Sequence, residues 1–311
     1  MRYRRYRVDA RVALAFAAIY VLWGGTFLAI RLTVLELPPL FASGVRFLIA
    51  GTTLYVFMRA RGHHSPTSQE WRSIAVTSLC LFVATYAALF WAEQYVPSGV
   101  ASVIEATLPI TAMVLEVFLF RQQRFRLRTG TALLLGFLGV AWLLIRNQHT
   151  VPVFPCLIIL ASGTAWSLGG VLTRSMRRPR SLPLTAGAQM MLGGIVLLAL
   201  SKATGELRTL PRITPQAAAA LLYLIVAGSL LGFTAYVWLL ARMPVTRVAS
   251  HAYVNPLIAL ALGYFVARES LTPGMLLASA LVIASVILIL TSPEDREPSA
   301  EIESKRLEAS L

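Results

Sequence analysis

The sequence predicts an all-α integral membrane protein with ten transmembrane helices, arranged as two inverted five-helix repeats. Of the 311 residues, 57% are hydrophobic and only 14% are charged, whereas ordinary soluble domains have about 45–50% apolar and about 25% charged residues. Apolar runs of the length that crosses a ~30 Å hydrocarbon core recur along the whole chain. The second half of the chain also repeats features of the first half. This composition excludes a cytosolic globular enzyme and a disordered chain.

The apolar runs define the expected helices in order along the chain. Outer-membrane barrels need short strands with alternating polarity, and such alternation is absent from the sequence, so we expect the spans to be helical. The first run follows several arginines but is too long for the apolar part of a signal peptide, and we interpret it as a retained helix. The expected spans are 12–31, 39–58, 73–93, 98–120, 129–146, 153–173, 183–203, 216–240, 246–267 and 272–291.

The basic residues predict the orientation in the membrane. A net charge of +14 could indicate a nucleic-acid partner, but 21 of the 28 Lys and Arg residues fall in the two tails and in alternate loops. Cytoplasmic loops of membrane proteins carry such an excess of positive charge. We therefore expect a multi-pass protein of the inner membrane with both termini in the cytoplasm and no nucleic-acid partner. The expected tails are residues 1–11 and the polar, disordered segment 292–311.

An internal repeat divides the membrane part into residues 12–146 and 153–291. Each half contains five expected spans, and an odd number makes the second half enter the membrane from the opposite side. Inverted repeats of this kind are typical of secondary transporters, which bind substrate near the middle of the membrane between the repeats. The matching pairs are Trp23 with Trp166 and Arg31 with Arg174 at an offset of 143, then Trp91 with Trp238, Pro97 with Pro244 and Pro109 with Pro256 at an offset of 147.

Several motifs resemble those of the EamA branch of the drug/metabolite transporter superfamily. They are Trp23-Gly24-Gly25-Thr26-Phe27, Arg46-Phe47, the segments Val100–Pro109 and Val248–Pro256, and Glu269, whose counterpart in the first half is Gln122. The resemblance covers roughly residues 12–291. It implies a ten-helix exporter of amino acids or other small metabolites, working by alternating access. It also implies a central cavity lined by helices 1, 3, 4, 6, 8 and 9.

Charged residues inside the spans are rare, and each is a candidate for function because charge is costly in a membrane. Arg46 either binds a substrate carboxylate, pairs with Glu105, or fixes helix packing. Glu105 precedes Pro109 by four residues, so its carbonyl loses its usual helical partner, and it is a candidate for proton coupling. Glu116 lies on the same face by helical periodicity, where a salt bridge near the helix end competes with a transport role. Glu93 belongs either to an outer vestibule or to a solvated helix end.

Helix 9 contains a polar stripe. His251 and Asn255 follow Arg247 at intervals of four residues, so the three share one face. His251 titrates in the physiological range and is a second candidate for proton coupling, although a packing role is an alternative. Asn255 precedes Pro256 and is a candidate hydrogen-bond partner for substrate. Pro109 and Pro256 are expected to interrupt their helices.

Aromatic residues are numerous enough to form an apolar binding surface, although helix packing and interfacial belts use the same residues. Trp23 and Trp166 stand out because each lies close to a glycine pair, which permits close helix approach or bending. The aromatic candidates for substrate binding are Trp23, Trp166, Tyr86, Trp91 and Tyr253.

The sequence lacks the motifs of other function classes. It has no nucleotide-binding fingerprint, Walker A motif or nucleophile elbow, so we expect no ATP, cofactor, metal or catalytic residues. Cys80 and Cys156 lie inside apolar runs and form no disulfide framework. The expected partners are a small metabolite and the bilayer. Transport is either coupled to protons or facilitated without ion coupling. Alternatives are transport of nucleotide sugars or lipid precursors, and less favoured ones are a membrane enzyme or a scaffold protein.

Overall fold

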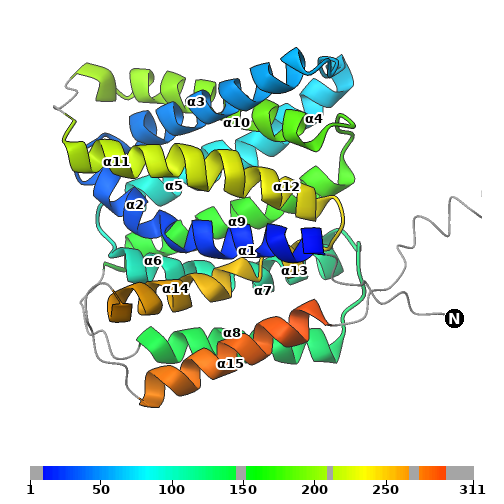
Figure 1. Ribbon diagram of the computed structural model, residues 1–311, viewed down its shortest axis with the longest axis vertical. Coiled ribbons are helices and arrows are strands. Elements are labelled where there is room, and N and C mark those ends of the chain that lie inside the picture. The colour runs from blue at the N-terminus through cyan, green and yellow to red at the C-terminus, as the bar shows by residue number, and fades with distance from the viewer. Residues whose placement is uncertain (1–9, 145–151, 209–212, 266–272, 292–311) are drawn as a thin grey trace, which may run out of the picture.

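The computed structural model describes residues 10–144, 152–208, 213–265 and 273–291, and within these ranges the secondary structure is helical and contains no strand. The long helices run side by side along a common direction (Figure 1). Both terminal tails, apart from Ala10 and Arg11, and Glu269 lie outside the described residues. Seven helices in these ranges are long and apolar enough to cross a membrane: Ala10–Val34, Pro39–Ala60, Ser68–Ala92, Ser98–Leu119, Val153–Ser175, Leu182–Ala203 and Pro215–Leu240.

The other three expected spans also coincide with helices. They correspond to α8, to α13 with α14, and to α15, and two of their apolar stretches, Leu127–Gly139 and Ser279–Leu290, are shorter than the seven long helices. The α-helices are α1 (Ala10–Gly24), α2 (Thr26–Val34), α3 (Pro39–Ala60), α4 (Ser68–Ser78), α5 (Thr85–Ala92), α6 (Ser98–Ile104), α7 (Leu108–Val114), α8 (Leu127–Leu144), α9 (Val153–Ser175), α10 (Leu182–Ala203), α11 (Pro215–Tyr223), α12 (Thr234–Leu240), α13 (Val245–Val248), α14 (His251–Phe265) and α15 (Pro273–Leu290).

Several spans contain a local change of helix type. π-helical segments Leu79–Ala84 and Leu224–Phe233 connect α4 to α5 and α11 to α12, and a third, Leu115–Leu119, follows α7. A 3₁₀ turn, Glu105–Thr107, joins α6 to α7. Such departures from α geometry shift the direction of the side chains that follow and are frequent at functional sites.

Prolines and hydroxyl residues set where helices begin. α3 and α11 begin at Pro39 and Pro215, where the missing N–H would have had no intrahelical partner. The Thr214 side chain caps α11 by accepting from Ala217 N, and Thr67 forms a reciprocal capping box with Glu70 at the start of α4. Local sequence therefore fixes these helix ends.

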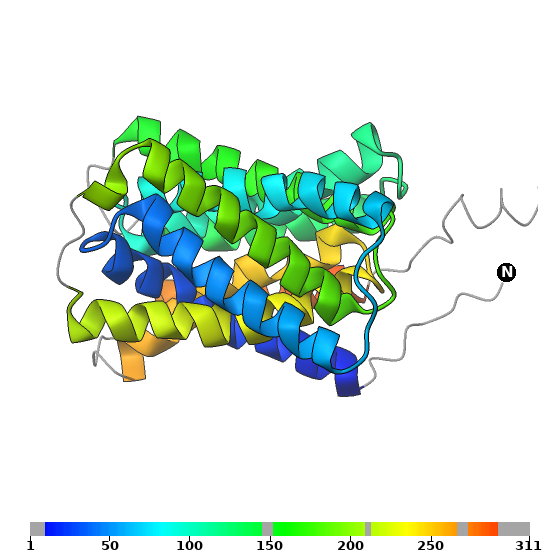
Figure 2. The same cartoon turned by 90° about the horizontal axis from the view of Figure 1, so that it is seen from above.

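The closest helix packing joins α3 and α10, which lie side by side (Figure 2). A Cβ atom at Gly187 would lie 2.7 Å from Tyr55 N, and one at Gly51 would overlap the backbone of Met191. A Cβ at Gly194 would likewise overlap Leu48 N. Glycines on both helices thus permit direct backbone contact, the arrangement that small residues give in membrane proteins.

Replacing Gly51 by alanine tests this contact. We expect Gly51→Ala to lower the free energy of unfolding by about 1–3 kcal/mol, the usual cost of inserting a methyl group into a filled interface. Gly99→Ala is the matched control, because a Cβ there meets no atom within 4 Å. Thermal unfolding of the purified protein in detergent measures both, and equal stability of the two variants would contradict the close contact.

Candidate functional site

A small cavity lies at the centre of the bundle. Its volume, counted as space open to the centre of a water-sized sphere, is about 50 Å³, which is room for a few water molecules. Its wall comes from spans 1, 3, 4, 6 and 9, as expected, but also from span 2, and it includes no residue of span 8. The expected helix 8 instead packs behind the wall. Four predicted polar residues line the cavity: Arg46, Glu105, His251 and Asn255.

Arg46 lies in the middle of the protein with only 1% of its surface exposed. Its Nε donates to Ser229 Oγ at 2.9 Å, and the centre of its guanidinium lies 4.6 Å from the Phe47 ring and 5.0 Å from the Tyr86 ring. Its Nη1 has no hydrogen-bond partner. The Phe47 and Tyr86 rings and the Ser229 hydroxyl therefore hold the Arg46 guanidinium, and its Nη1 makes no hydrogen bond.

Glu105 reaches the same cavity from the 3₁₀ turn in span 4. Its Oε1 accepts from Ser162 Oγ at 3.0 Å, and Ser162 Oγ is also 2.8 Å from the Ile159 carbonyl. A hydroxyl has one hydrogen but can also accept. If the carboxyl is protonated, it can donate to Ser162 while Ser162 donates to Ile159, so the site satisfies both forms of Glu105.

One alternative for Glu105 is absent from the structure. Arg46 and Glu105 form no ion pair among the described residues, because Arg46 donates to Ser229 and Glu105 accepts from Ser162. The Glu105 carbonyl does lose its usual partner, because Pro109 has no N–H, and it accepts from Leu108 N instead. The chain tightens into a 3₁₀ turn, which replaces the missing i+4 donor by the i+3 donor.

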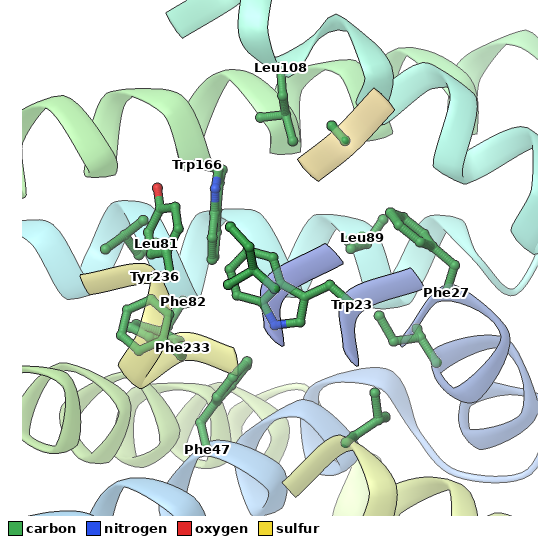
Figure 3. Packing of buried hydrophobic residues seen from close by; sticks show 14 of the residues in the cluster. Trp23, Phe27, Phe47, Leu81, Phe82, Leu89, Leu108, Trp166, Phe233 and Tyr236 are labelled. Atoms are coloured by element: carbon green, nitrogen blue, oxygen red, sulfur yellow. The ribbon is translucent and has the colours of Figure 1, made fainter. Parts of the chain in front are cut away.

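Three predicted aromatic residues, Trp23, Tyr86 and Trp166, also line the cavity. The Trp23 ring centroid is 5.5 Å from that of Trp166, and Trp166 is 6.0 Å from Tyr86. Trp23 also donates from Nε1 to the Gly228 carbonyl at 2.9 Å. Figure 3 shows Trp23 and Trp166 among residues of spans 3 and 8, with Tyr236 beside Trp166.

Residues of span 9 complete the wall. His251 begins α14, lies 4.7 Å from Trp23 between ring centroids, and has Nδ1 2.9 Å from the Val248 carbonyl. A carbonyl only accepts, so we assign the hydrogen to Nδ1, which leaves Nε2 as an acceptor. Asn255 is buried and its Oδ1 has no partner. Pro256 lies inside α14 and does not end it.

Two predicted aromatic residues lie away from the cavity. Tyr253 is fully buried against α8, where its hydroxyl donates to the Leu133 carbonyl at 2.8 Å. Trp91 contacts the rings of Tyr95 and Phe154 near the end of span 3. Neither residue touches the cavity, so they are packing residues in this structure.

Sequence comparison assigns the family. The profile of the EamA-like transporter family matches residues 11–145 and 153–291. The chain belongs to this family. It is 32% identical over 278 residues to the Uncharacterized inner membrane transporter YedA of Escherichia coli (strain K12), covering 88% of this chain and 89% of the relative. It is 25% identical to the Uncharacterized transporter YvbV of Bacillus subtilis (strain 168), covering 93% and 95%.

A crystal structure shares the fold of this EamA-like transporter. The two chains superpose with a TM-score of 0.73 at 18% identity, and the match covers 88% of this chain and 94% of the other. Family membership and the apolar helices make the protein a membrane transporter and point away from an enzyme.

Glu116 has a structural position in the transporter. Its carboxylate accepts from Val245 N at 2.7 Å, Thr246 N at 3.0 Å, Thr246 Oγ1 at 2.7 Å and Gln123 Nε2 at 2.9 Å. It therefore caps the start of α13 from span 4. Glu116 is not among the residues that line the cavity with Glu105.

Serine and threonine side chains complete the site of the transporter, and the sequence analysis missed them. Ser229 and Ser162 hold Arg46 and Glu105, and Thr26 and Thr85 line the cavity. Serine and threonine in a membrane helix are weak sequence indicators of a binding site, because their hydroxyl groups often bond only their own backbone. Thr26, for example, donates to the Trp23 carbonyl.

Removing the Glu116 carboxylate is expected to destabilise the transporter. Glu116→Ala leaves three buried donors, Val245 N, Thr246 N and Thr246 Oγ1, without their acceptor, and hydrogen bonds to charged groups contribute about 1.5–3 kcal/mol each. Glu70→Ala, which removes an exposed capping carboxylate, should cost at most about 1 kcal/mol. Chemical or thermal unfolding in detergent compares the two variants. A loss for Glu116→Ala no larger than for Glu70→Ala would show that the cap contributes little.

Proposed function

We propose that this EamA-like protein is a secondary transporter of the inner membrane that exports a small metabolite, an amino acid or a related compound, by alternating access. The observation that carries the proposal is the central cavity, where side chains from different spans present a cation, a carboxyl group and aromatic rings to one common space. Charged groups at this depth are costly unless they serve a partner.

An amino acid carries the two charged groups that could pair with the unused donors and acceptors of the cavity. The unused Arg46 Nη1 is a donor suited to a carboxylate, while Glu105 and the unpartnered Asn255 Oδ1 are acceptors suited to an ammonium group. Trp23, Tyr86 and Trp166 give an apolar surface for a side chain. A nucleotide sugar would require several phosphate-binding cations, and Arg46 is the one Lys or Arg in the cavity wall described here, which favours the amino acid.

Ten helices in two inverted repeats are the architecture that we propose for this function. Two separate matches to the family profile, residues 11–145 and 153–291, support it. So does the π-helical segment Leu79–Ala84, since adding the offset of 147 gives residues 226–231, inside Leu224–Phe233. Trp23 and Trp166, paired by the sequence repeat, meet at the centre. Residues 12–146 and 153–291 form the two repeats in this proposal.

Both termini are cytoplasmic in this proposal. The start of α1 and the ends of α3, α12 and α15 lie at one end of the bundle (Figure 1). The loops that follow α3 and α12, and the loops before α8 and after α9, carry several arginines, in agreement with the excess of positive charge on the cytoplasmic side. They are Arg61, Arg242, Arg121, Arg124, Arg126, Arg177, Arg178 and Arg180. The opposite end of the bundle is then the outer side.

The structure corresponds to a closed form in this cycle. Binding sites for small molecules measure about 300–1,000 Å³, and space for a few waters does not admit an amino acid. The cavity must widen for substrate to enter. Gly25, which separates α1 from α2, and the π-helical segments of spans 3 and 8 are the places where the helices would bend.

Transport by purified protein in liposomes tests the proposal. Uptake and efflux of pooled amino acids and other metabolites identify the substrate. Arg46→Lys removes the planar group that offers Nη1, and we expect about 10-fold or greater loss of transport, since one charge-assisted hydrogen bond contributes about 1.5–3 kcal/mol. Trp166→Leu should reduce transport and the matched Trp91→Leu should not. The proposal fails if no small metabolite moves or if Arg46→Lys is without effect.

Proton coupling is a separate prediction. If Glu105 or His251 exchanges the coupled proton, a pH gradient should drive accumulation in wild-type liposomes. Glu105→Gln or His251→Ala should then abolish the response, since neither replacement titrates near neutral pH. Glu70→Gln is the control for loss of a carboxylate outside the cavity. If both cavity variants keep the wild-type transport rate and pH dependence, the prediction of proton coupling through Glu105 or His251 is wrong. Facilitated transport without coupling at these residues then remains.

A further inference from the structure

Glu93 is a buried acidic residue for which the cavity gives no role. It is the C-cap of α5, at the end of span 3 away from the start of α1, and its exposed fraction is 0%. The expectation of a solvated helix end is therefore wrong. Neither carboxyl oxygen, Oε1 or Oε2, has a hydrogen-bond partner. Removing a carboxylate from water without hydrogen bonds is so costly that the group favours its neutral form.

Two other carboxyl groups of the same chain, the buried Glu116 and the half-buried Glu206, each accept at least three hydrogen bonds. Glu116 accepts four hydrogen bonds at the start of α13. Glu206 accepts from Leu40 N, Phe41 N and Ser201 Oγ near the start of α3. A structural role in this protein thus comes with several donors, and Glu93 has none. A buried polar group without a partner requires another explanation.

The charged neighbours of Glu93 connect it to the cavity. Glu105 acts on it as a like charge, and Arg31 and Arg46 act as opposite charges. Arg31, on α2, also donates from Nη1 to the backbone carbonyl of Glu93, so its guanidinium already lies against this residue. Leu89, one turn earlier on α5, lines the cavity. Of the other elements packed on α5, α9 and the π-helical segment Leu79–Ala84 contribute no described charge that acts on Glu93.

We propose that Glu93 is a proton-binding site at the outer end of the transport path, one turn beyond the cavity, with Arg31 as the counter-ion of its ionised form. When the outer side opens, water reaches Glu93 and the carboxylate pairs with Arg31. A proton from water then adds to a carboxylate oxygen and breaks this ion pair. The neutral carboxylic acid is buried when the outer side closes, which is the form described here. The proton later leaves to water or to ionised Glu105, and no other bond changes.

This proposal rests on the proposed transport function, but its first test does not require transport. Infrared spectroscopy of the full-length purified protein detects the C=O stretch of protonated carboxyl groups at neutral pH. We expect a band that is absent from Glu93→Gln, remains in Glu70→Gln, and shifts in heavy water as the proton exchanges. Because Gln is nearly isosteric with Glu, the variant is expected to fold, and Glu93→Asp gives a second variant that keeps a carboxyl group. A Glu93→Gln spectrum identical to the wild type overturns the proposal.

The second test measures coupling in liposomes with the substrate found above. The readout is the ratio of accumulation with a pH gradient to accumulation without one, which does not depend on the amount of active protein. We expect this ratio to fall to about one in Glu93→Gln and to recover in part in Glu93→Asp. A ratio equal to the wild type in Glu93→Gln overturns the role of Glu93. If no substrate is transported, the proposed function fails, and the infrared band with its exchange still decides whether Glu93 binds a proton.

Discussion

The cost of removing charge from water is the constraint that organises the centre of this protein. Arg46 is nearly fully buried, and Ser229, Phe47 and Tyr86 surround it on three sides. Ser162 holds Glu105 within the same cavity. Each charged group therefore has its own partners and does not depend on the other. Both remain available to a third molecule, whereas a direct ion pair between them would have to be broken before substrate could bind.

The packing around the cavity combines fixed and adjustable contacts. α3 and α10 meet through glycines at backbone distance, and this contact leaves no space for relative movement. α3 also contributes Arg46, so the cation rests on the most tightly packed helix pair. Glu105 and His251, in contrast, lie at interruptions of their spans, in the 3₁₀ turn of span 4 and directly after α13 in span 9. The cation is thus held rigidly, while the groups that titrate lie where helices bend.

Much of the fold was readable from the sequence, because hydropathy alone decides which segments cross a membrane. Span positions and the helical class followed from composition, and the rarity of charge in the spans selected Arg46 and Glu105, which both line the cavity. Which face of a helix meets a cavity was harder to predict. Tyr253 is two residues from His251 but packs on α8, and Glu116 bonds the start of α13 whereas Glu105 lines the cavity. Turns of 3₁₀ and π type change the helical phase. Pro109 marks the 3₁₀ turn of span 4, but no residue pattern in the sequence marks the π-helical segments.

The partners of buried groups were not predictable either. Ser229 and Ser162 come from spans distant in sequence from the residues that they hold, and isolated serines carry no specific signal. Glu93 looked like an ordinary helix end, because sequence gives no measure of how neighbouring helices cover a terminus. Its burial depends on the packing of α2, α3 and α9 against α5. Packing between helices that are distant in sequence therefore determines the partners of both serines and the burial of Glu93, and no local sequence pattern encodes it.

The contact between Trp23 and Trp166 has a mechanical consequence. The two rings meet edge to face at 77°, and ring contacts of this kind contribute about 0.5–1.5 kcal/mol and tolerate a range of angles. The ring contact between spans 1 and 6 therefore survives a modest change of angle between the two rings. The hydrogen bond from Trp23 to Gly228, which does depend on direction, ties the same ring to span 8. Trp23 is thus held by a directional bond toward span 8 and by an angle-tolerant ring contact toward span 6.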